Sequence, residues 1–187
     1  MSISARVVFL FVGTLALTAQ AQGILYVRHF ETQALFYSQQ GVVSGCGVRL
    51  MGVAEDLNQV VDASVNISNR EGRLFGVLKF LSYDLAMRQG EPNLRPVAVS
   101  SGWLRPREGD PVVPATEAAK GDDQVSVIYG LNAEDAADLL LAAAQRQHFL
   151  VAVTREVSNF ERVYSGPVQM SKRDHDEIGG CLDELLR

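Results

Sequence analysis

The two cysteines, Cys46 and Cys181, are the residues whose chemistry the sequence constrains most. In an oxidising compartment they have one possible pairing, which closes a loop covering most of the chain. No CxxC motif is present, so a disulfide oxidoreductase is not indicated. Gly45 and Gly47 flank Cys46 as glycines can flank a nucleophile, but a disulfide would consume that thiol. The sequence therefore predicts a structural disulfide, with two separate buried thiols as the alternative.

The remaining titratable side chains match no recognised catalytic or metal-binding spacing. There is no HExxH motif, no close histidine pair and no GxSxG nucleophile turn. Acidic neighbours surround His175, but acids are favoured in the first turn of a helix, so we interpret this cluster as a solvated helix start. Other neighbouring carboxylates are interpreted as solvated surface groups, because a glycosidase pair forms in space rather than along the chain. We therefore expect no catalytic residue, no metal ligand and no cofactor. The residues considered for these roles are His29, His148, His175, Glu55, Asp56, Asp62, Asp122 and Asp123.

The segment with the clearest binding chemistry contains the only tryptophan of the chain. Trp103 is followed by Arg105 and Arg107, which lie on either side of Pro106. Tryptophan and arginine are the residue types most enriched at interface hot spots. The alternative is that Trp103 fills the core beneath a long loop, because tryptophan is highly buried on average. We take Trp103, Arg105 and Arg107 as the candidate binding residues.

The N-terminal segment resembles an export signal in its composition. Arg6 precedes the apolar stretch Val7–Leu17, and Ala19 and Ala21 form the small-residue exit before Gln22. The apolar stretch is about half the ~20 residues that span a bilayer, so an uncleaved anchor is the weaker interpretation. We expect residues 1–21 to be a secretory signal peptide and residues 22–187 to be the exported protein, periplasmic or secreted.

Composition narrows the classes of partner. The chain has 187 residues, of which 17 are basic and 22 acidic, giving a formal net charge of −5. Nucleic acids and anionic membrane surfaces attract proteins through clusters of Lys and Arg, which this chain lacks. We expect neither nucleic-acid binding nor stable membrane insertion once the signal has been removed. The exported part is the size of one domain.

The elements that must position these residues begin with a hairpin. Residues 59–67 alternate, with Val61, Ala63 and Val65 on one face and Asp62 and Ser64 on the other. A turn at 68–72 leads to a partner strand at 73–83, which is apolar on both faces and so is typical of a central, covered strand. Further strands are predicted at 32–37, within 42–54, and at 97–104, 124–129, 149–154 and 160–164.

Two helices and one long loop complete the prediction. Asn132 is a predicted N-cap for a helix over about 132–146, and Ser171 for a second over about 171–186. Cys181 lies on the apolar stripe of the second helix, which Gly179 and Gly180 weaken. Five of the six prolines fall within residues 87–123, so this region is predicted to be mostly a Pro/Gly-rich loop with one edge strand.

These observations predict one α+β domain, with an antiparallel sheet built around the 59–83 hairpin and both helices packed on it. We expect an exported, non-catalytic binding or protein-interaction domain. Its partner is then an envelope or extracellular protein, or a small ligand. The alternative is an exported hydrolase whose site is assembled only by folding. An enzyme requires titratable groups that converge in a pocket, whereas a binding module requires an exposed apolar or aromatic patch.

Overall fold

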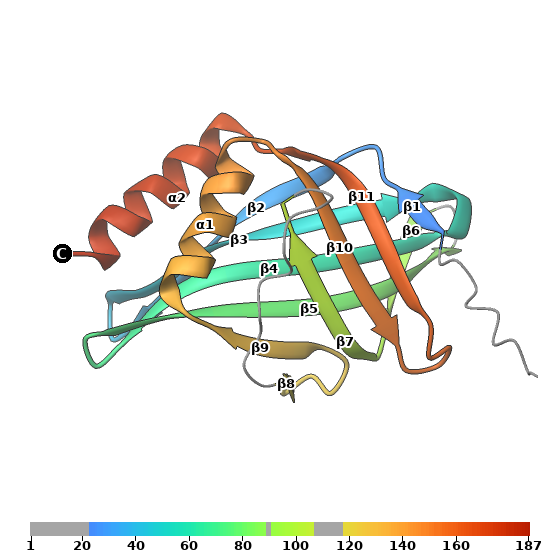
Figure 1. The fold of residues 1–187 in the computed structure, drawn as a ribbon, viewed down its shortest axis with the longest axis horizontal. Coiled ribbons are helices and arrows are strands. Elements are labelled where there is room, and N and C mark those ends of the chain that lie inside the picture. The colour runs from blue at the N-terminus through green and yellow to red at the C-terminus, as the bar shows by residue number, and fades with distance from the viewer. Residues whose placement is uncertain (1–22, 89–90, 107–117) are drawn as a thin grey trace, which may run out of the picture.

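The computed structural model describes residues 23–88, 91–106 and 118–187. The predicted signal peptide, residues 1–21, and Arg107 lie outside these ranges. The described chain forms one large sheet and two helices (Figure 1), which confirms the α+β class. The elements are β1 (Ile24–Tyr26), β2 (Phe30–Gln39), β3 (Val42–Ala54), a short 3-10 turn (Glu55–Leu57), β4 (Gln59–Arg70), β5 (Arg73–Arg88), β6 (Glu91–Val97), β7 (Val99–Arg105), β8 (Ala118–Lys120), β9 (Val127–Leu131), α1 (Ala133–Ala144), β10 (His148–Arg155), β11 (Glu161–Gln169) and α2 (Lys172–Leu185).

The sheet follows the order β7-β10-β11-β2-β3-β4-β5-β9-β8, with β1 beside β11 and β6 beside β5. We call β2–β6, β8 and β9 the main sheet, and β1, β7, β10 and β11 the front sheet. Among the described strands, the ladder that joins them is a short parallel pairing of β11 with β2, at Val168–Phe30 and Gln169–Glu31. Because this joint is so short, the front sheet can fold over the main sheet, and Figure 1 shows it lying in front of β2–β5.

The core lies between the main sheet and the elements in front of it. Alternate residues of β3, β4 and β5 point into this space, including Val48, Val65 and Phe80, which are almost fully buried. Phe80 packs against Gly102 of β7, where a Cβ would lie 2.6 Å from its ring. The far ends of the sheet approach without forming a ladder, and the Gly102 backbone N–H donates to the Tyr129 hydroxyl at 3.0 Å. The sheet is therefore strongly folded but unclosed.

Both helices cover the same inner face of the main sheet (Figure 1). The Asn132 side chain accepts a hydrogen bond from the Asp135 backbone at 2.7 Å and begins α1, which packs on β4 and β5. Ser171 caps α2 in the same way, through the Asp174 backbone at 3.0 Å. Asn and Ser at these positions satisfy N–H groups that the first helical turn leaves unpaired.

The disulfide is present and joins the last helix to the main sheet. Cys46 on β3 bonds Cys181 on α2, with their Cα atoms 5.9 Å apart. Ile178 and Leu185, one helical turn from Cys181 on either side, are also buried. The disulfide therefore fixes the apolar stripe of α2 against β3, as the sequence predicted.

The predicted loop over residues 87–123 is wrong for most of the described part of that region. β5 continues to Arg88, β6 runs alongside it, and only then does β7 begin. Pro92 and Pro96 are tolerated because β6 pairs with β5 alone, so a nitrogen without a hydrogen can face the open edge. Proline density therefore marked an edge strand here rather than a loop.

Candidate functional site

The outer face of the main sheet is the surface that faces away from the core, and it carries an ordered polar row. The register places Arg49 of β3 beside Ser64 of β4, and Ser64 beside Lys79 of β5. Their side chains alternate with inward-facing neighbours, so all three point away from the core. Figure 1 shows both helices and the front sheet on the opposite, inner side. Within the described residues, this polar row therefore belongs to an uncovered surface.

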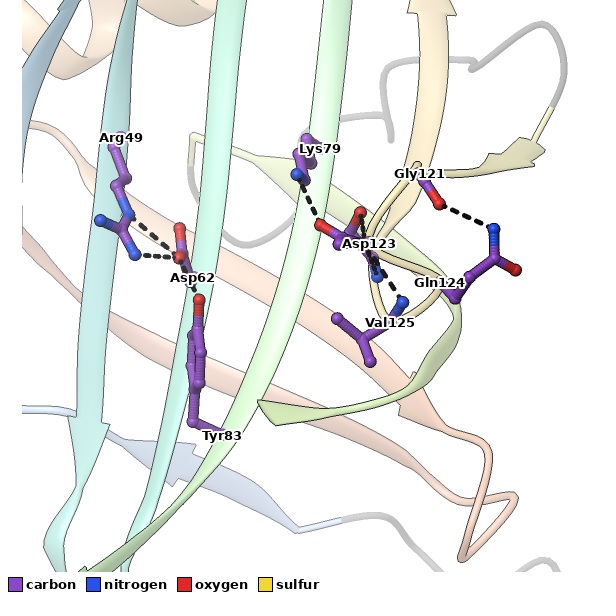
Figure 2. Close-up of polar contacts among 9 residues, drawn as sticks. Arg49, Asp62, Lys79, Tyr83, Gly121, Asp123, Gln124 and Val125 are labelled. Carbon is purple, nitrogen blue, oxygen red and sulfur yellow. Dashed lines mark hydrogen bonds and ion pairs between the residues drawn. The ribbon is translucent and has the colours of Figure 1, made fainter. Parts of the chain in front are cut away.

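A buried carboxylate forms the centre of one network on this face. Asp62 is only 2% exposed, and its Oδ2 accepts hydrogen bonds from Arg49 Nε at 3.0 Å and Nη2 at 2.5 Å. The same oxygen accepts the Tyr83 hydroxyl at 3.3 Å (Figure 2). Arg49 and Tyr83 come from the strands on either side of β4, so Asp62 ties three strands together.

The charges of this network are fixed by its own hydrogen bonds. The hydrogen bond to Asp62 raises the pKa of Arg49, which therefore stays cationic. Burial raises the pKa of Tyr83, and the nearby Asp62 carboxylate raises it further. Tyr83 therefore remains a neutral donor at physiological pH and does not supply a phenolate base.

A second carboxylate anchors the turn between β8 and β9 to the same face. Asp123 Oδ2 accepts from Lys79 Nζ at 2.8 Å, while Oδ1 accepts from the Ser126 backbone N–H at 2.8 Å and the Ser126 hydroxyl at 2.7 Å. The hydrogen bond from Lys79 holds the pKa of Asp123 well below its ordinary value. Figure 2 shows this cluster beside the Asp62 network, across β4 and β5. Each cation of the row thus has its own carboxylate.

Apolar side chains surround the two networks. Val53 is 38% exposed and Phe75 37%, and further partly exposed apolar residues lie on the neighbouring rows of the same face. These rows are set by the strand register and contain Leu35, Met51, Val77, Leu81 and Ile128. The centre of the outer face is therefore a mixed surface in which the charges are paired and the surrounding side chains are largely apolar.

The prediction of solvated carboxylates is wrong for Asp62. A carboxylate at the centre of a sheet needs donors from both neighbouring strands, and a pairing of that kind is invisible before the register is known. Arg49 is nevertheless the only cation in residues 42–54, and Asp62 the only charge in residues 59–67. Two isolated opposite charges in adjoining apolar strands were the available signal for this pair.

Trp103 lies on the front sheet, on the side away from the core. Its neighbours on β7 point inward, since Leu104 is 1% exposed and Gly102 contacts Phe80. The Trp103 indole Nε1 donates to Glu161 at 2.9 Å, and the Arg105 guanidinium lies 5.1 Å from the indole ring. Trp103 does not fill the core, and the candidate residues Trp103 and Arg105 are adjacent and held in place.

The three histidines lie apart from one another, and His29 lies 3.6 Å from Glu31. His175 lies 3.7 Å from Asp176 on the exposed start of α2, and His148 bonds the Ser165 hydroxyl at 2.7 Å on the front sheet. The part of the chain that the structure describes contains no group of three His, Cys, Asp or Glu side chains placed to hold a metal ion.

Beside Arg49 there is a shallow depression of about 290 Å³, lined by Glu31, Thr32, Gln33, Arg49 and Met51.

No described helix is long and apolar enough to cross a membrane. Comparisons with protein-family models, with curated proteins and with solved structures gave no match to this chain.

Proposed function

We propose that this chain is an exported, non-catalytic interaction domain that binds another protein through the outer face of the main sheet. The export part rests on the N-terminal segment, whose composition is that of a secretory signal, and on the Cys46–Cys181 disulfide. Structural disulfides persist in the periplasm and outside the cell and are rare in the cytosol. A periplasmic or secreted location is therefore consistent with both observations.

The observation that carries the proposal is the Arg49–Asp62–Tyr83 network within an apolar surround. Arginine and tyrosine are enriched at interface hot spots, and an interface core is poor in unpaired charge. At the centre of this face the charges are already neutralised, because Arg49 pairs with Asp62 and Lys79 with Asp123. A partner can therefore cover the apolar rows without leaving an unpaired charge buried beneath it.

The chemistry of the face indicates the kind of partner. Because Arg49 and Lys79 at the centre of the face are already paired, this centre offers phosphate groups little attraction, so nucleic acid and anionic lipid are poor candidates. A flat apolar patch on a second protein fits better, with hydrogen-bond acceptors at its rim for the spare donors of Arg49 and Lys79. The Trp103–Arg105 patch on the front sheet remains a second candidate surface, and Arg107 remains a candidate from the sequence alone. A small ligand is the other class of partner that we retain.

An exported hydrolase is the alternative function. It would need an acid, a base or a nucleophile free to act on a bound substrate. In the outer-face networks Asp62 already accepts from Arg49 and Tyr83, and Asp123 from Lys79 and Ser126. These bonds favour a positioning role for the two carboxylates, and therefore favour binding over catalysis.

The test is site-specific photo-crosslinking in the cells that produce the protein. A photoreactive amino acid replaces Leu81, which is half-buried on the outer face, and in a matched variant it replaces Leu141, which is 56% exposed on α1. We expect a discrete protein adduct from position 81 that is absent from position 141, and we expect Val77→Arg to abolish it. Equal labelling at the two positions, or no adduct at position 81, would overturn the assignment of this face.

A further inference from the structure

A second polar cluster lies at the interface between the two sheets. Gln59 of β4 and Asp84 of β5 are cross-strand partners in the main sheet, and they meet Arg155 of β10 and two residues of β11, Arg162 and Tyr164. Arg155 Nη2 donates to Asp84 Oδ1 at 2.6 Å. Arg162 Nη1 and the Tyr164 hydroxyl both donate to Gln59 Oε1, the latter at 3.1 Å. The cluster therefore bridges the two sheets rather than lying on either outer face.

These groups are buried far more than is usual for their type. Arg155 is 4% exposed, Gln59 7% and Tyr164 not at all. The Arg155 Nε is buried and has no hydrogen-bond partner. Leaving a donor of a charged group unpaired in the interior is costly, so an interior arginine normally has its donors satisfied. Arg155 therefore lacks an acceptor that its position requires.

The deficit extends to the whole cluster. A guanidinium carries several N–H donors and no acceptor, and the cluster has two of them together with a tyrosine hydroxyl and a carboxamide. The side-chain acceptors that these donors contact are one carboxylate oxygen of Asp84 and the Gln59 carbonyl, which already receives two donors. The arrangement therefore has many donors directed at few acceptors.

Positive charge is in surplus as well. Val153 pairs with Arg162 across β10 and β11, which makes Arg155, two residues on from Val153, a diagonal neighbour of Arg162 on the same inward face. The cluster's one carboxylate, Asp84, is 53% exposed and so is partly screened by water. Arg155 is almost fully buried and Arg162 partly buried, and two guanidinium groups at neighbouring positions of one face repel each other unless an anion lies between them.

We propose that Arg155 and Arg162 form a binding site for an oxyanion, the carboxylate or phosphate group of a small molecule that enters from the Asp84 side. The planar guanidinium fork matches both groups and binds them through paired hydrogen bonds. Burial raises the pKa of Tyr164, so its hydroxyl stays protonated and keeps donating to Gln59 beside the two guanidinium groups. The half-exposed Asp84 holds Arg155 in place until the ligand competes for it. This site does not depend on the protein-binding role of the outer face.

The experiment titrates the disulfide-bonded protein with inorganic phosphate and, separately, with acetate at constant ionic strength, following amide shifts by NMR. We expect saturable shifts confined to the ends of β4, β5, β10 and β11 with at least one probe. Saturation by phosphate alone or by acetate alone identifies which oxyanion the site takes. Chloride should produce no saturating shift. If neither phosphate nor acetate saturates in the millimolar range, the site does not exist.

Two variants and one control make the result specific. Arg162→Gln should weaken binding about tenfold, because a charge-assisted hydrogen bond is lost. Asp84→Asn, at a half-exposed position where folding should be retained, removes the competing carboxylate and should tighten binding severalfold. Arg173→Gln, which alters an exposed pair on α2, should leave the affinity unchanged. Unchanged affinity in both Arg162→Gln and Asp84→Asn would overturn the proposal.

Discussion

The two faces of the main sheet are stabilised in different ways. The inner face carries apolar side chains and is covered by α1, α2 and the front sheet, so its stability comes from removing apolar surface from water. The outer face has no described element over it, and its central strand carries polar residues that are nevertheless buried, Asp62, Ser64 and Asn66. These residues are buried by their neighbours within the sheet rather than by a second layer.

This difference predicts how strongly amino-acid substitutions on each face affect stability. An inner-face residue depends on the elements that cover it, so its contacts are long-range and are lost together when a covering element leaves. An outer-face residue such as Asp62 depends on partners from the two adjacent strands, Arg49 of β3 and Tyr83 of β5. The inner face should therefore dominate stability, and the outer face should be free to serve binding.

The largest expected effect comes from detaching α2 from the inner face. Replacing Cys46 and Cys181 together by serine removes a bridge across a sequence separation of 135 residues, and should lower the free energy of unfolding by about 5 kcal/mol. Chemical denaturation measures the change, and the wild-type protein in reductant should show the same loss. A loss of under about 1 kcal/mol would mean that packing alone holds α2 against β3.

A smaller effect is expected on the outer face. Asp62→Asn keeps the shape of the side chain but removes the charge that Arg49 and Tyr83 bind, and should cost about 2 kcal/mol. The same denaturation measurement on Asp176→Asn, at an exposed position of α2, should show almost no change. If the two variants are equally stable, the Asp62 network does not contribute to the fold.

Gly76 of β5 and Gly179 of α2 differ in how closely neighbouring atoms surround them. A Cβ on Gly76 would lie 2.6 Å from the Ala136 Cβ of α1, so Gly76→Ala should destabilise the protein by about 2 kcal/mol. A Cβ on Gly179 meets nothing within 4 Å, and alanine is the better helix former, so Gly179→Ala should stabilise α2 by about 1 kcal/mol. Thermal unfolding of the two variants should shift in opposite directions. A lower unfolding temperature for Gly179→Ala would contradict the helix argument.

The smallest effect is a dependence on acidic pH. Lys79 lowers the pKa of folded Asp123 below the value it has in the unfolded chain, so the folded state binds this proton less readily. The resulting stabilisation is fully present above the unfolded pKa and is lost as the pH falls through the folded one. The difference in unfolding free energy between the wild type and Asp123→Asn should therefore shrink as the pH falls below about 4. A difference that does not change with pH would exclude this ionisation as the cause.

Several elements were predictable because local chemistry specifies them. Asn132 and Ser171 are capping residues, and the structure uses both to begin a helix. A strand was predicted within residues 42–54 and β3 fills that stretch, and the β4–β5 hairpin includes the alternating residues 59–67. Each of these signals lies within a few residues of the feature it predicts.

β6 was missed because proline is compatible with a strand only at an edge, and edge position is a property of the whole sheet.

The candidate sites depended on contacts between distant residues. Asp62 meets Arg49 across 13 positions and Asp84 meets Arg155 across 71, so neither pair shares a local motif. Trp103 and Arg105 were recognisable by residue type, but the sequence left open whether Trp103 filled the core. The inward orientation of Gly102 and Leu104 decided that question, because neighbouring residues of a strand point to opposite faces.

The sequence by itself determined which residues begin the helices, which strands alternate and which cysteines can pair, because each depends on local backbone preference or on having a single possible partner. The tertiary structure decided which face each charge occupies. It placed Asp62 between two donors and left Arg155 short of an acceptor, although both are charged residues buried within strands. The cost of a buried charge depends on the groups that the fold brings within hydrogen-bond distance, and only the strand register and the folding of the front sheet over the main sheet set those distances.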